Sequence, residues 1–193
     1  MKITNTPLKG LIVLEPEVFT DDRGYFLEIF HQKRFLEAGI DSKFVQENHS
    51  RSSKGVTRGL HYQIRNPQAQ LVTVIRGRIF DVGVDLRKAS PTFGDWYGVE
   101  LHENGPRQIY MAPGFAHGFC VLSDWADLHY KVTEFYNPHD ESGLIWDDPT
   151  VGINWPTIER SVSSRDLKFS KLSEKTNSDL PQFLNHDFLN RIH

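Results

Sequence analysis

The chain has 193 residues, of which 38% are hydrophobic and 24% are charged, and its formal net charge is −3 at pH 7. This composition is ordinary for a globular protein, and the length is sufficient for one domain with a sizeable core. The weakly negative charge excludes a general electrostatic attraction to nucleic acid or to an anionic membrane surface. No apolar run approaches the length of a membrane span, so we expect neither nucleic acid nor membrane as a partner.

Cysteine usage and composition bear on location and domain organisation. The one cysteine, Cys120, rules out an intrachain disulfide, and the N-terminus shows no secretory pattern, so the sequence predicts a cytoplasmic protein. We expect a single domain over residues 1–193. The composition becomes polar after residue 156, which marks residues 156–193 as a C-terminal extension whose end carries a weak helical pattern of Phe183, Leu184, Phe188 and Leu189.

The first third of the chain is predicted to contain short strands, turns and one helical segment. Its strand formers predict strands over residues 1–15, 25–30 and 44–46, whereas turn and loop residues occupy 17–24 and 48–54. Residues 31–39 have helical character and stop at Gly39, a typical helix end.

The middle of the chain is predicted to be almost entirely β-structure. Strand formers dominate residues 55–63, 71–75, 79–86, 96–101, 108–112, 119–122 and 128–136, and turn residues separate these runs. Six or more short strands at such spacing predict a mainly β protein, either a sandwich or a closed barrel of the jelly-roll kind.

The sequence RGLHYQ carries the first residues suited to chemistry. Arg58 is a fixed cation, and His61 is a base that titrates near neutral pH. On a strand, alternation places His61 and Gln63 on one face and Leu60 and Tyr62 on the other. Taken alone, such a polar face is more typical of a solvated surface than of a ligand site.

Two further candidates follow in later strands. Tyr130 shares its strand face with Leu128 and Val132, so its hydroxyl is expected inside the barrel, where it needs a partner. A turn is expected to deliver His117 to the start of a strand. Each residue alone is equally typical of a structural role. Barrels of this kind usually bind a metal through His-x-His, whereas His61 is followed by Tyr-Gln, so no metal is expected.

Motifs in a fixed order between residues 14 and 166 carry a resemblance to a known family. They are DRGYFLE at 22–28, FVQENHS at 44–50, RGLHYQ at 58–63, FDVGVDLR at 80–87, SPTFG at 90–94, PGFAHGF at 113–119, YK at 130–131 and INWP at 153–156. In these motifs the chain resembles the dTDP-4-dehydrorhamnose 3,5-epimerase family. The resemblance implies a jelly-roll cupin barrel that epimerises a nucleotide-linked 4-keto-6-deoxy sugar without cofactor or metal, in deoxysugar biosynthesis for a cell-surface polysaccharide.

The catalytic residues that the resemblance implies fit this chemistry. Epimerisation beside a ketone needs one group that removes a proton and another that returns a proton to the opposite face. His61 corresponds to the base, Asp166 to the carboxylate that orients it, and Tyr130 to the acid. A neutral imidazole suits the role of base because its ordinary pKa is roughly 6.5.

The resemblance also implies a set of substrate-binding residues. Arg23 and Arg58 correspond to contacts with the pyrophosphate, since an arginine fork matches phosphate oxygens. His117 is expected near the sugar and the phosphates. The residues expected to contact the nucleoside, some of them from a neighbouring subunit, are Phe19, Phe26, Glu28, Gln46 and Asn48. Gln70 and Lys131 complete the set of predicted binding residues.

Two residues depart from the family pattern. Gln70 stands where a lysine usually lies near the 4-keto oxygen, and a cation there would stabilise the developing enolate. Either another cation such as Arg58 takes over this role, or the substrate and the rate differ from those of the typical member. Phe135 stands where a tyrosine is common, and the lost hydroxyl bears on whether C5 is inverted as well as C3.

We expect a homodimer in which the N-terminal strands extend the sheet of the partner and remove an exposed sheet edge. Several alternatives stay open from the sequence. The chain could be a C3-only epimerase, an epimerase of a GDP- or CDP-linked keto sugar such as a heptose derivative, a non-catalytic sugar-nucleotide binding cupin, or a metal-dependent cupin oxygenase.

Overall fold

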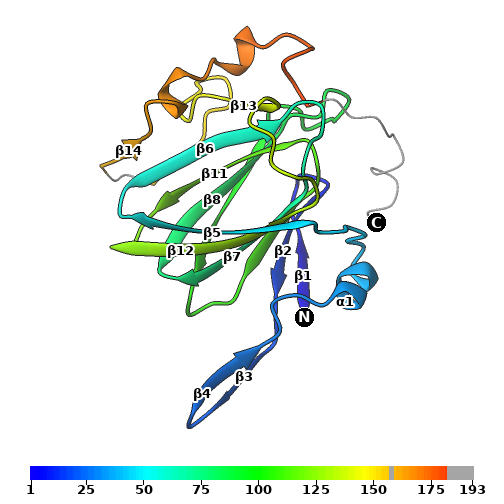
Figure 1. The fold of residues 1–193 in the computed structure, drawn as a ribbon, viewed down its shortest axis with the longest axis vertical. Helices are drawn as coiled ribbons and strands as arrows, with labels where there is room; N and C mark the ends of the chain where they lie inside the picture. The colour runs from blue at the N-terminus through cyan, green and yellow to red at the C-terminus, as the bar shows by residue number, and fades with distance from the viewer. Residues whose placement is uncertain (157–158, 182–193) are drawn as a thin grey trace.

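Two β-sheets packed face to face form the body of the protein in a computed structural model that describes residues 1–156 and 159–181 (Figure 1). The first sheet contains, in spatial order, β1 (Lys2–Asn5), β2 (Leu11–Glu15), β10 (Gln108–Met111), β7 (Gln70–Arg76), β12 (Trp125–Val132) and β5 (Gln46–Ser53). The second contains β13 (Glu141–Gly143), β6 (Val56–Gln63), β11 (Phe115–Val121), β8 (Arg78–Asp85) and β9 (Trp96–His102), and β14 (Ser161–Val162) pairs with β6. This arrangement confirms the predicted jelly-roll class.

Apolar side chains fill the space between the sheets and also cover the outside of the second sheet. Leu14, Leu71 and Ile109 are buried in the inner cluster. A second cluster lies on the outer face of the second sheet and includes Leu60 and Trp155. The inner cluster leaves room at one end of the barrel for a polar cavity.

The N-terminal segment differs from its prediction. Residues 17–24 were expected to form a turn, but Val18–Asp21 form β3, which pairs with Gly24–Leu27 as β4. The turn is confined to the two residues between these strands, where Asp21 accepts a hydrogen bond from the Arg23 backbone N–H at 2.9 Å. This hairpin projects away from the barrel (Figure 1). The short helix α1 (Gln32–Glu37) follows, as the sequence predicts.

The prediction of a polar loop at residues 48–54 is also wrong. Most of this segment belongs to β5, which pairs with β12 along its whole length. One face of β5 lines the polar cavity and the other faces solvent, so neither face needs apolar residues. This removes the alternation of apolar and polar residues by which a strand is usually recognised.

Residues of the FDVGVDLR and SPTFG motifs stabilise the connection between β8 and β9. The carboxylate of Asp85 is fully buried and accepts hydrogen bonds from Arg87 Nε at 2.8 Å, Ser90 Oγ at 2.6 Å and Thr92 Oγ1 at 2.7 Å. A buried charge is tolerated only when it is paired and its lone pairs are satisfied. These motif residues therefore stabilise the fold and lie outside the cavity.

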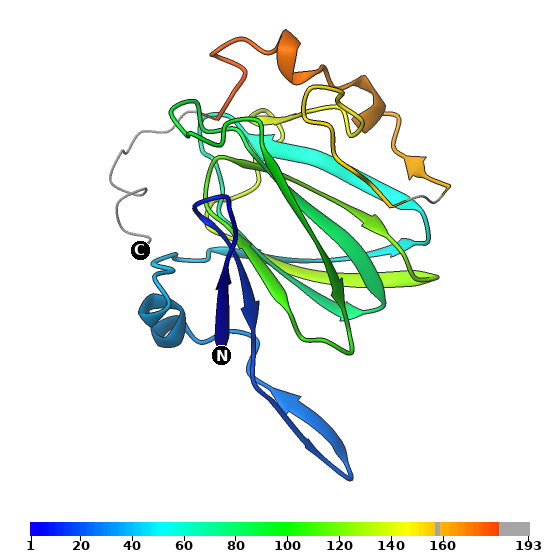
Figure 2. The ribbon, with the colours of Figure 1, turned by 180° about the vertical axis from the view of Figure 1, so that it is seen from behind.

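The C-terminal segment crosses the outside of the second sheet beside β6 (Figure 1, Figure 2). It contains β14 and the short 3-10 helices η1 (Asp166–Lys168) and η2 (Leu172–Glu174), and Leu180 is buried in the outer cluster. The helical pattern predicted near the end of the chain, at Phe183, Leu184, Phe188 and Leu189, lies outside the described residues. Within residues 1–156 and 159–181, no helix is both long and apolar enough to cross a bilayer.

Candidate active site

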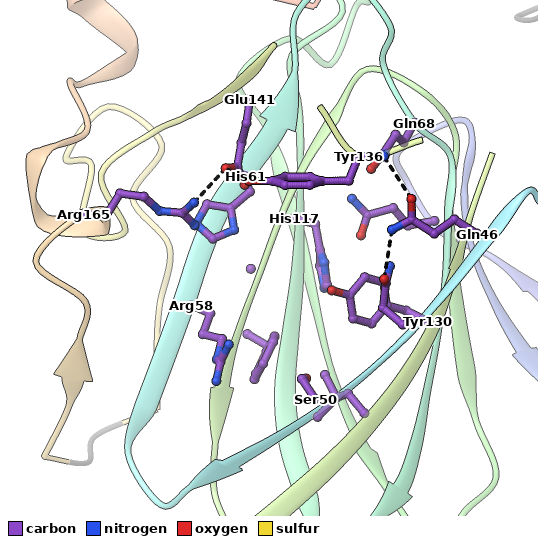
Figure 3. A pocket seen from close by; sticks show the side chains of 15 residues that line it. Gln46, Ser50, Arg58, His61, Gln68, His117, Tyr130, Tyr136, Glu141 and Arg165 are labelled. Carbon is purple, nitrogen blue, oxygen red and sulfur yellow. Dashed lines mark hydrogen bonds and ion pairs between the residues drawn. The ribbon is translucent and has the colours of Figure 1, made fainter. Parts of the chain in front are cut away.

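A cavity of about 340 Å³ lies inside the barrel, between β5, β7 and β12 of the first sheet and β6 and β11 of the second (Figure 3). Polar side chains from both sheets enter it. Of the residues predicted from the sequence to form the site, those that line the cavity are Gln46, Asn48, Arg58, His61, Gln70, His117 and Tyr130. The structure therefore brings the predicted base and the predicted acid into one enclosed space.

A β-bulge places Arg58 and His61 together in the cavity. From Arg58 to His61, β6 advances by three residues, while the matching step on β11, from Phe119 to His117, is two residues. An extra residue of this kind turns positions of odd spacing to the same face. Gly59 permits the close approach, because a Cβ atom there would lie 2.5 Å from a Cα atom of β11.

Gln63 follows His61 by two residues, beyond the bulge, but it does not line the cavity. Its amide is buried, donates to the carbonyl of Asn66 at 2.8 Å and accepts from the N–H of Asn137 at 2.7 Å. Gln63 thus holds the loops on either side of the strand rather than a ligand.

His61 is paired with the buried carboxylate of Asp166. His61 Nε2 lies 2.9 Å from Asp166 Oδ1, and the N–H of Gly59 donates to Oδ2 at 3.3 Å. Burial raises the pKa of Asp166, but the hydrogen bond and charge of His61, with the Gly59 N–H, outweigh burial and bring it to about 2. An ionised carboxylate only accepts hydrogen bonds. Nε2 therefore carries the hydrogen, which leaves Nδ1 as the basic nitrogen of the neutral ring.

Tyr130 enters the cavity from β12, on the wall opposite the strand that carries His61 (Figure 3). Burial raises the pKa of its phenol, the negative charge of Glu141 adds to this effect, and the positive charge of Arg58 opposes it. A phenol whose pKa is raised keeps its proton at neutral pH. Tyr130 is thus poised to donate a proton and not to remove one.

A second histidine is held in the same way on the neighbouring strand. His117 Nε2 lies 2.9 Å from Oδ2 of Asp81, whose side chain is fully buried. Asp81 Oδ1 has no hydrogen-bond partner among the described residues. His117 is the third residue of β11, which begins at Phe115 and thus before the run of strand formers predicted at 119–122.

Three residues that the sequence did not single out surround the cavity mouth. Glu141 Oε2 accepts from the Tyr136 hydroxyl at 2.9 Å and from Arg165 Nη1 at 2.7 Å. Arg165 Nη2 also lies 3.2 Å from His61 Nε2, but both groups are donors when Nε2 carries the hydrogen, and the guanidinium donates instead from Nε to Asp166 Oδ1 at 3.3 Å. These side chains come from β13 and from segments far apart in the sequence. The one available signal was the position of Arg165 next to Asp166.

Phe135, which stands where the family usually has a tyrosine, is not part of this site. The side chain of Phe135 is 68% exposed and does not line the cavity. Its neighbour Tyr136 does, and its ring lies across the cavity mouth beside His61 (Figure 3). The hydroxyl at the mouth therefore comes from Tyr136, and the missing hydroxyl of Phe135 leaves the cavity unchanged.

The other predicted binding residues lie away from the cavity of their own chain. Lys131 is on the opposite face of β12, where it forms an ion pair with Glu47. The remaining four are on or next to the β3–β4 hairpin and are Phe19, Arg23, Phe26 and Glu28. For a metal, the described part of the chain offers no group of three or more His, Cys, Asp or Glu side chains placed to hold an ion.

Known proteins are similar to this chain in both sequence and fold. The sequence model of the dTDP-4-dehydrorhamnose 3,5-epimerase family matches residues 5–174. The dTDP-4-dehydrorhamnose 3,5-epimerase of Methanothermobacter thermautotrophicus is 49% identical over 176 residues, covering 90% of this chain and 95% of the relative. The dTDP-4-dehydrorhamnose 3-epimerase of Streptomyces niveus is 40% identical over 182 residues, covering 93% of this chain and 88% of the relative.

A solved structure extends the likeness to three dimensions. The dTDP-6-deoxy-D-glucose-3,5-epimerase of Legionella pneumophila, crystallised with dTDP-4-keto-L-rhamnose, matches with a TM-score of 0.92 and 45% identity. The match covers 95% of this chain and 99% of that one. Fold, cavity and relatives together define the chain as a cupin-type carbohydrate epimerase, an isomerase. Within that class it belongs to the dTDP-4-dehydrorhamnose 3,5-epimerase family, as its motifs predict.

Proposed function

We propose that the chain converts dTDP-4-dehydro-6-deoxyglucose to dTDP-4-dehydrorhamnose by inverting C3 and C5. The observation that carries this proposal is that the His61–Asp166 pair and Tyr130 enter one cavity from opposite walls. A sugar ring between these walls would meet a base on one face and a proton donor on the other. This is the arrangement that inversion beside a ketone requires.

Each inversion proceeds through an enolate in two balanced proton transfers, and the pair of transfers occurs once for C3 and once for C5. Nδ1 of His61 removes the proton from the carbon beside the ketone, and the electrons of that C–H bond move to the 4-keto oxygen. Asp166 stabilises the imidazolium that forms. Tyr130 then donates its proton to the opposite face of the carbon while the oxygen returns to the ketone. Exchange with solvent removes the proton from His61 and returns one to Tyr130.

The enolate oxygen needs a hydrogen-bond donor, and two cavity side chains can supply one. Gln70 keeps a neutral donor at the position where a lysine is usual. His117, whose Nε2 is held by the buried Asp81, can donate from Nδ1 only as the imidazolium. A donor aimed at developing negative charge in an enclosed site lowers the barrier to the reaction. Arg58, in the same cavity, is suited to the pyrophosphate because its planar fork matches phosphate oxygens.

We further propose a homodimer in which the hairpin of one subunit completes the cavity of the other. The side chains of Phe19 and Phe26 on the hairpin are 56% and 69% exposed, which is unusual for large apolar residues in a free monomer. At the hairpin base a groove of about 250 Å³ contains Leu27 and Ile75 and is suited to an apolar contact. Arg23, at the hairpin tip, would then reach the partner's substrate.

A mixing experiment tests this exchange of hairpins. Arg23→Ala and His61→Asn should each lose activity as pure dimers. In a heterodimer, one cavity has an intact His61 and receives an intact hairpin, whereas the other has neither. Co-expression in equal amounts should therefore restore about a quarter of wild-type activity, because half of the dimers are mixed and half of their sites are whole. No recovery would place Arg23 and His61 in the same subunit's site.

One relative supports an alternative outcome at C5. The Streptomyces niveus protein, which matches over nearly the whole chain, is named as a 3-epimerase. Incubation with dTDP-4-dehydro-6-deoxyglucose and NMR analysis of the product separates the two activities, since each inverted centre changes its own coupling constants. Inversion at both carbons supports the proposal, and inversion at C3 only supports the alternative. A substrate left unchanged, while GDP- or CDP-linked sugars are inverted or merely bound, would overturn it.

A further inference from the structure

His61 has a second neighbour besides its carboxylate, the ring of Phe169. The ring centroids of His61 and Phe169 are 5.7 Å apart, and the ring planes make an angle of 73°. Aromatic rings favour this edge-to-face geometry, which is directional because one ring presents its edge to the face of the other. Phe169 lies three residues after Asp166, so the single turn η1 delivers both neighbours of the imidazole.

The neighbouring strand β13 leaves space for this phenyl ring. Gly143 on β13 is the register partner of His61, and a Cβ atom on Gly143 would lie 2.4 Å from Cε2 of Phe169. The absence of a side chain at Gly143 thus lets the phenyl ring lie against the strand backbone beside the imidazole. The backbone around Phe169 is also tied to this strand region, because Ile145 N–H donates to the carbonyl of Ser170 at 3.2 Å.

The carboxylate fixes only one nitrogen of the imidazole. A hydrogen bond from Nε2 to Asp166 leaves the ring able to tilt about that contact and to turn about the Cβ–Cγ bond. The ring of Phe169 occupies one of the directions in which it would move. The two contacts together restrict the plane of the ring, and the plane determines where Nδ1 points.

We propose that Phe169 is a positioning residue that keeps the His61 ring in the orientation in which Nε2 is held by Asp166 and Nδ1 is free for the substrate. The inference rests on the proposed function, because only a base needs one particular nitrogen turned toward the sugar. Removal of the phenyl ring leaves Asp166 in place but allows the imidazole to tilt and to turn about its Cβ–Cγ bond. The chemical step slows, while the contacts that bind the substrate stay intact.

Three variants test this role. Phe169→Ala removes the contact, Phe169→Leu keeps an apolar side chain of similar reach, and Leu167→Ala is the matched control, since Leu167 is on the same turn but 54% exposed. For Phe169→Ala, kcat should fall roughly tenfold with KM within about twofold of wild type, as expected for a misplaced base. Phe169→Leu should recover most of this loss, and Leu167→Ala should match wild type.

Nitrogen-15 NMR of the His61 side chain gives a readout that does not depend on turnover. The wild type and Leu167→Ala should show a single tautomer with the hydrogen on Nε2. Phe169→Ala should show averaged shifts from both nitrogens, because a ring that turns about the Cβ–Cγ bond withdraws Nε2 from Asp166. A wild-type kcat for Phe169→Ala with unchanged nitrogen shifts, an equal loss in Leu167→Ala, or a wild-type hydrogen on Nδ1 would overturn the inference. If the wild type inverts no substrate, the proposed function fails, and the NMR comparison still decides the positioning role.

Discussion

His61 and His117 are register partners on β6 and β11, and each imidazole is held by its own buried carboxylate at 2.9 Å. The carboxylates differ in their surroundings. Both oxygens of Asp166 accept hydrogen bonds, whereas Oδ1 of Asp81 has no partner among the described residues. The two histidines thus face one substrate pocket as two separately anchored groups. Neutral His61 presents Nδ1 as a base, whereas His117 can donate to the enolate only as the imidazolium.

The first prediction concerns the carboxylate behind the base. In Asp166→Asn the amide oxygen still accepts a hydrogen bond from His61, but the negative charge that stabilises the imidazolium is lost. We expect kcat to fall by about 100-fold or more, with KM little changed, because the loss affects the transition state. Steady-state kinetics on the folded variant measure this. A kcat close to that of wild type would remove Asp166 from the mechanism.

The second prediction is a pH dependence of stability. The pKa of Asp166 is about 2 in the folded protein, against an ordinary value of 3.8. Since folding lowers this pKa, the ionised carboxylate stabilises the fold above the unfolded-state pKa, and the effect is lost as pH falls toward about 2. The shift corresponds to about 2 kcal/mol at neutral pH.

Urea unfolding of the wild type and Asp166→Asn at several pH values measures the contribution of the Asp166 carboxylate to the free energy of unfolding. The difference in their free energies of unfolding should be largest at pH 7 and should shrink between about pH 4 and pH 2. A difference that stays constant over this range would show that Asp166 is not stabilised as a carboxylate in the fold.

The barrel and much of the cavity could be predicted because their physical signals are local. Short runs of strand formers between turn residues are sufficient to indicate a jelly roll. The inward position predicted for Tyr130 is correct, because Tyr130 shares its strand face with the apolar Leu128 and Val132. The resemblance to the family then singled out His61 and Asp166, which the structure joins across more than a hundred residues of sequence.

The remaining features depend on contacts that a sequence does not display. Strand β5 was hidden because both of its faces are polar, and the bulge that turns Arg58 into the cavity is seen only in the register of β6 against β11. Glu141 and Arg165 meet only because the C-terminal segment folds back over the second sheet. Such long-range pairing leaves no periodic pattern to detect.

The third prediction separates the acid from the base. In Tyr130→Phe, His61 can still remove the proton beside the ketone, but no group returns one to the opposite face. The variant should therefore exchange that hydrogen with deuterium from solvent while forming little inverted product. Mass spectrometry of the recovered substrate measures the exchange, and NMR measures the inversion. Normal inversion by Tyr130→Phe would mean that another group, such as Tyr136, is the acid.

The fourth prediction concerns the missing lysine. Gln70 lines the cavity and supplies a neutral donor, so Gln70→Lys should place a cation near the 4-keto oxygen. We expect kcat to rise by about threefold to tenfold, less than the full effect of adding a donor, since a donor is already present. Gln70→Met is the control, as it keeps the length and removes the donor. A fall in kcat for Gln70→Lys would show that the cavity has adapted to glutamine.

The most direct test of the account is the reaction of dTDP-4-dehydro-6-deoxyglucose in deuterium oxide, followed position by position in the product. With the wild type, deuterium should appear at C3 and C5, together with inversion at both carbons, and His61→Asn should incorporate no more than the reaction without enzyme. Inversion without deuterium, or full incorporation by His61→Asn, would contradict proton removal by His61 as the chemistry of this cavity.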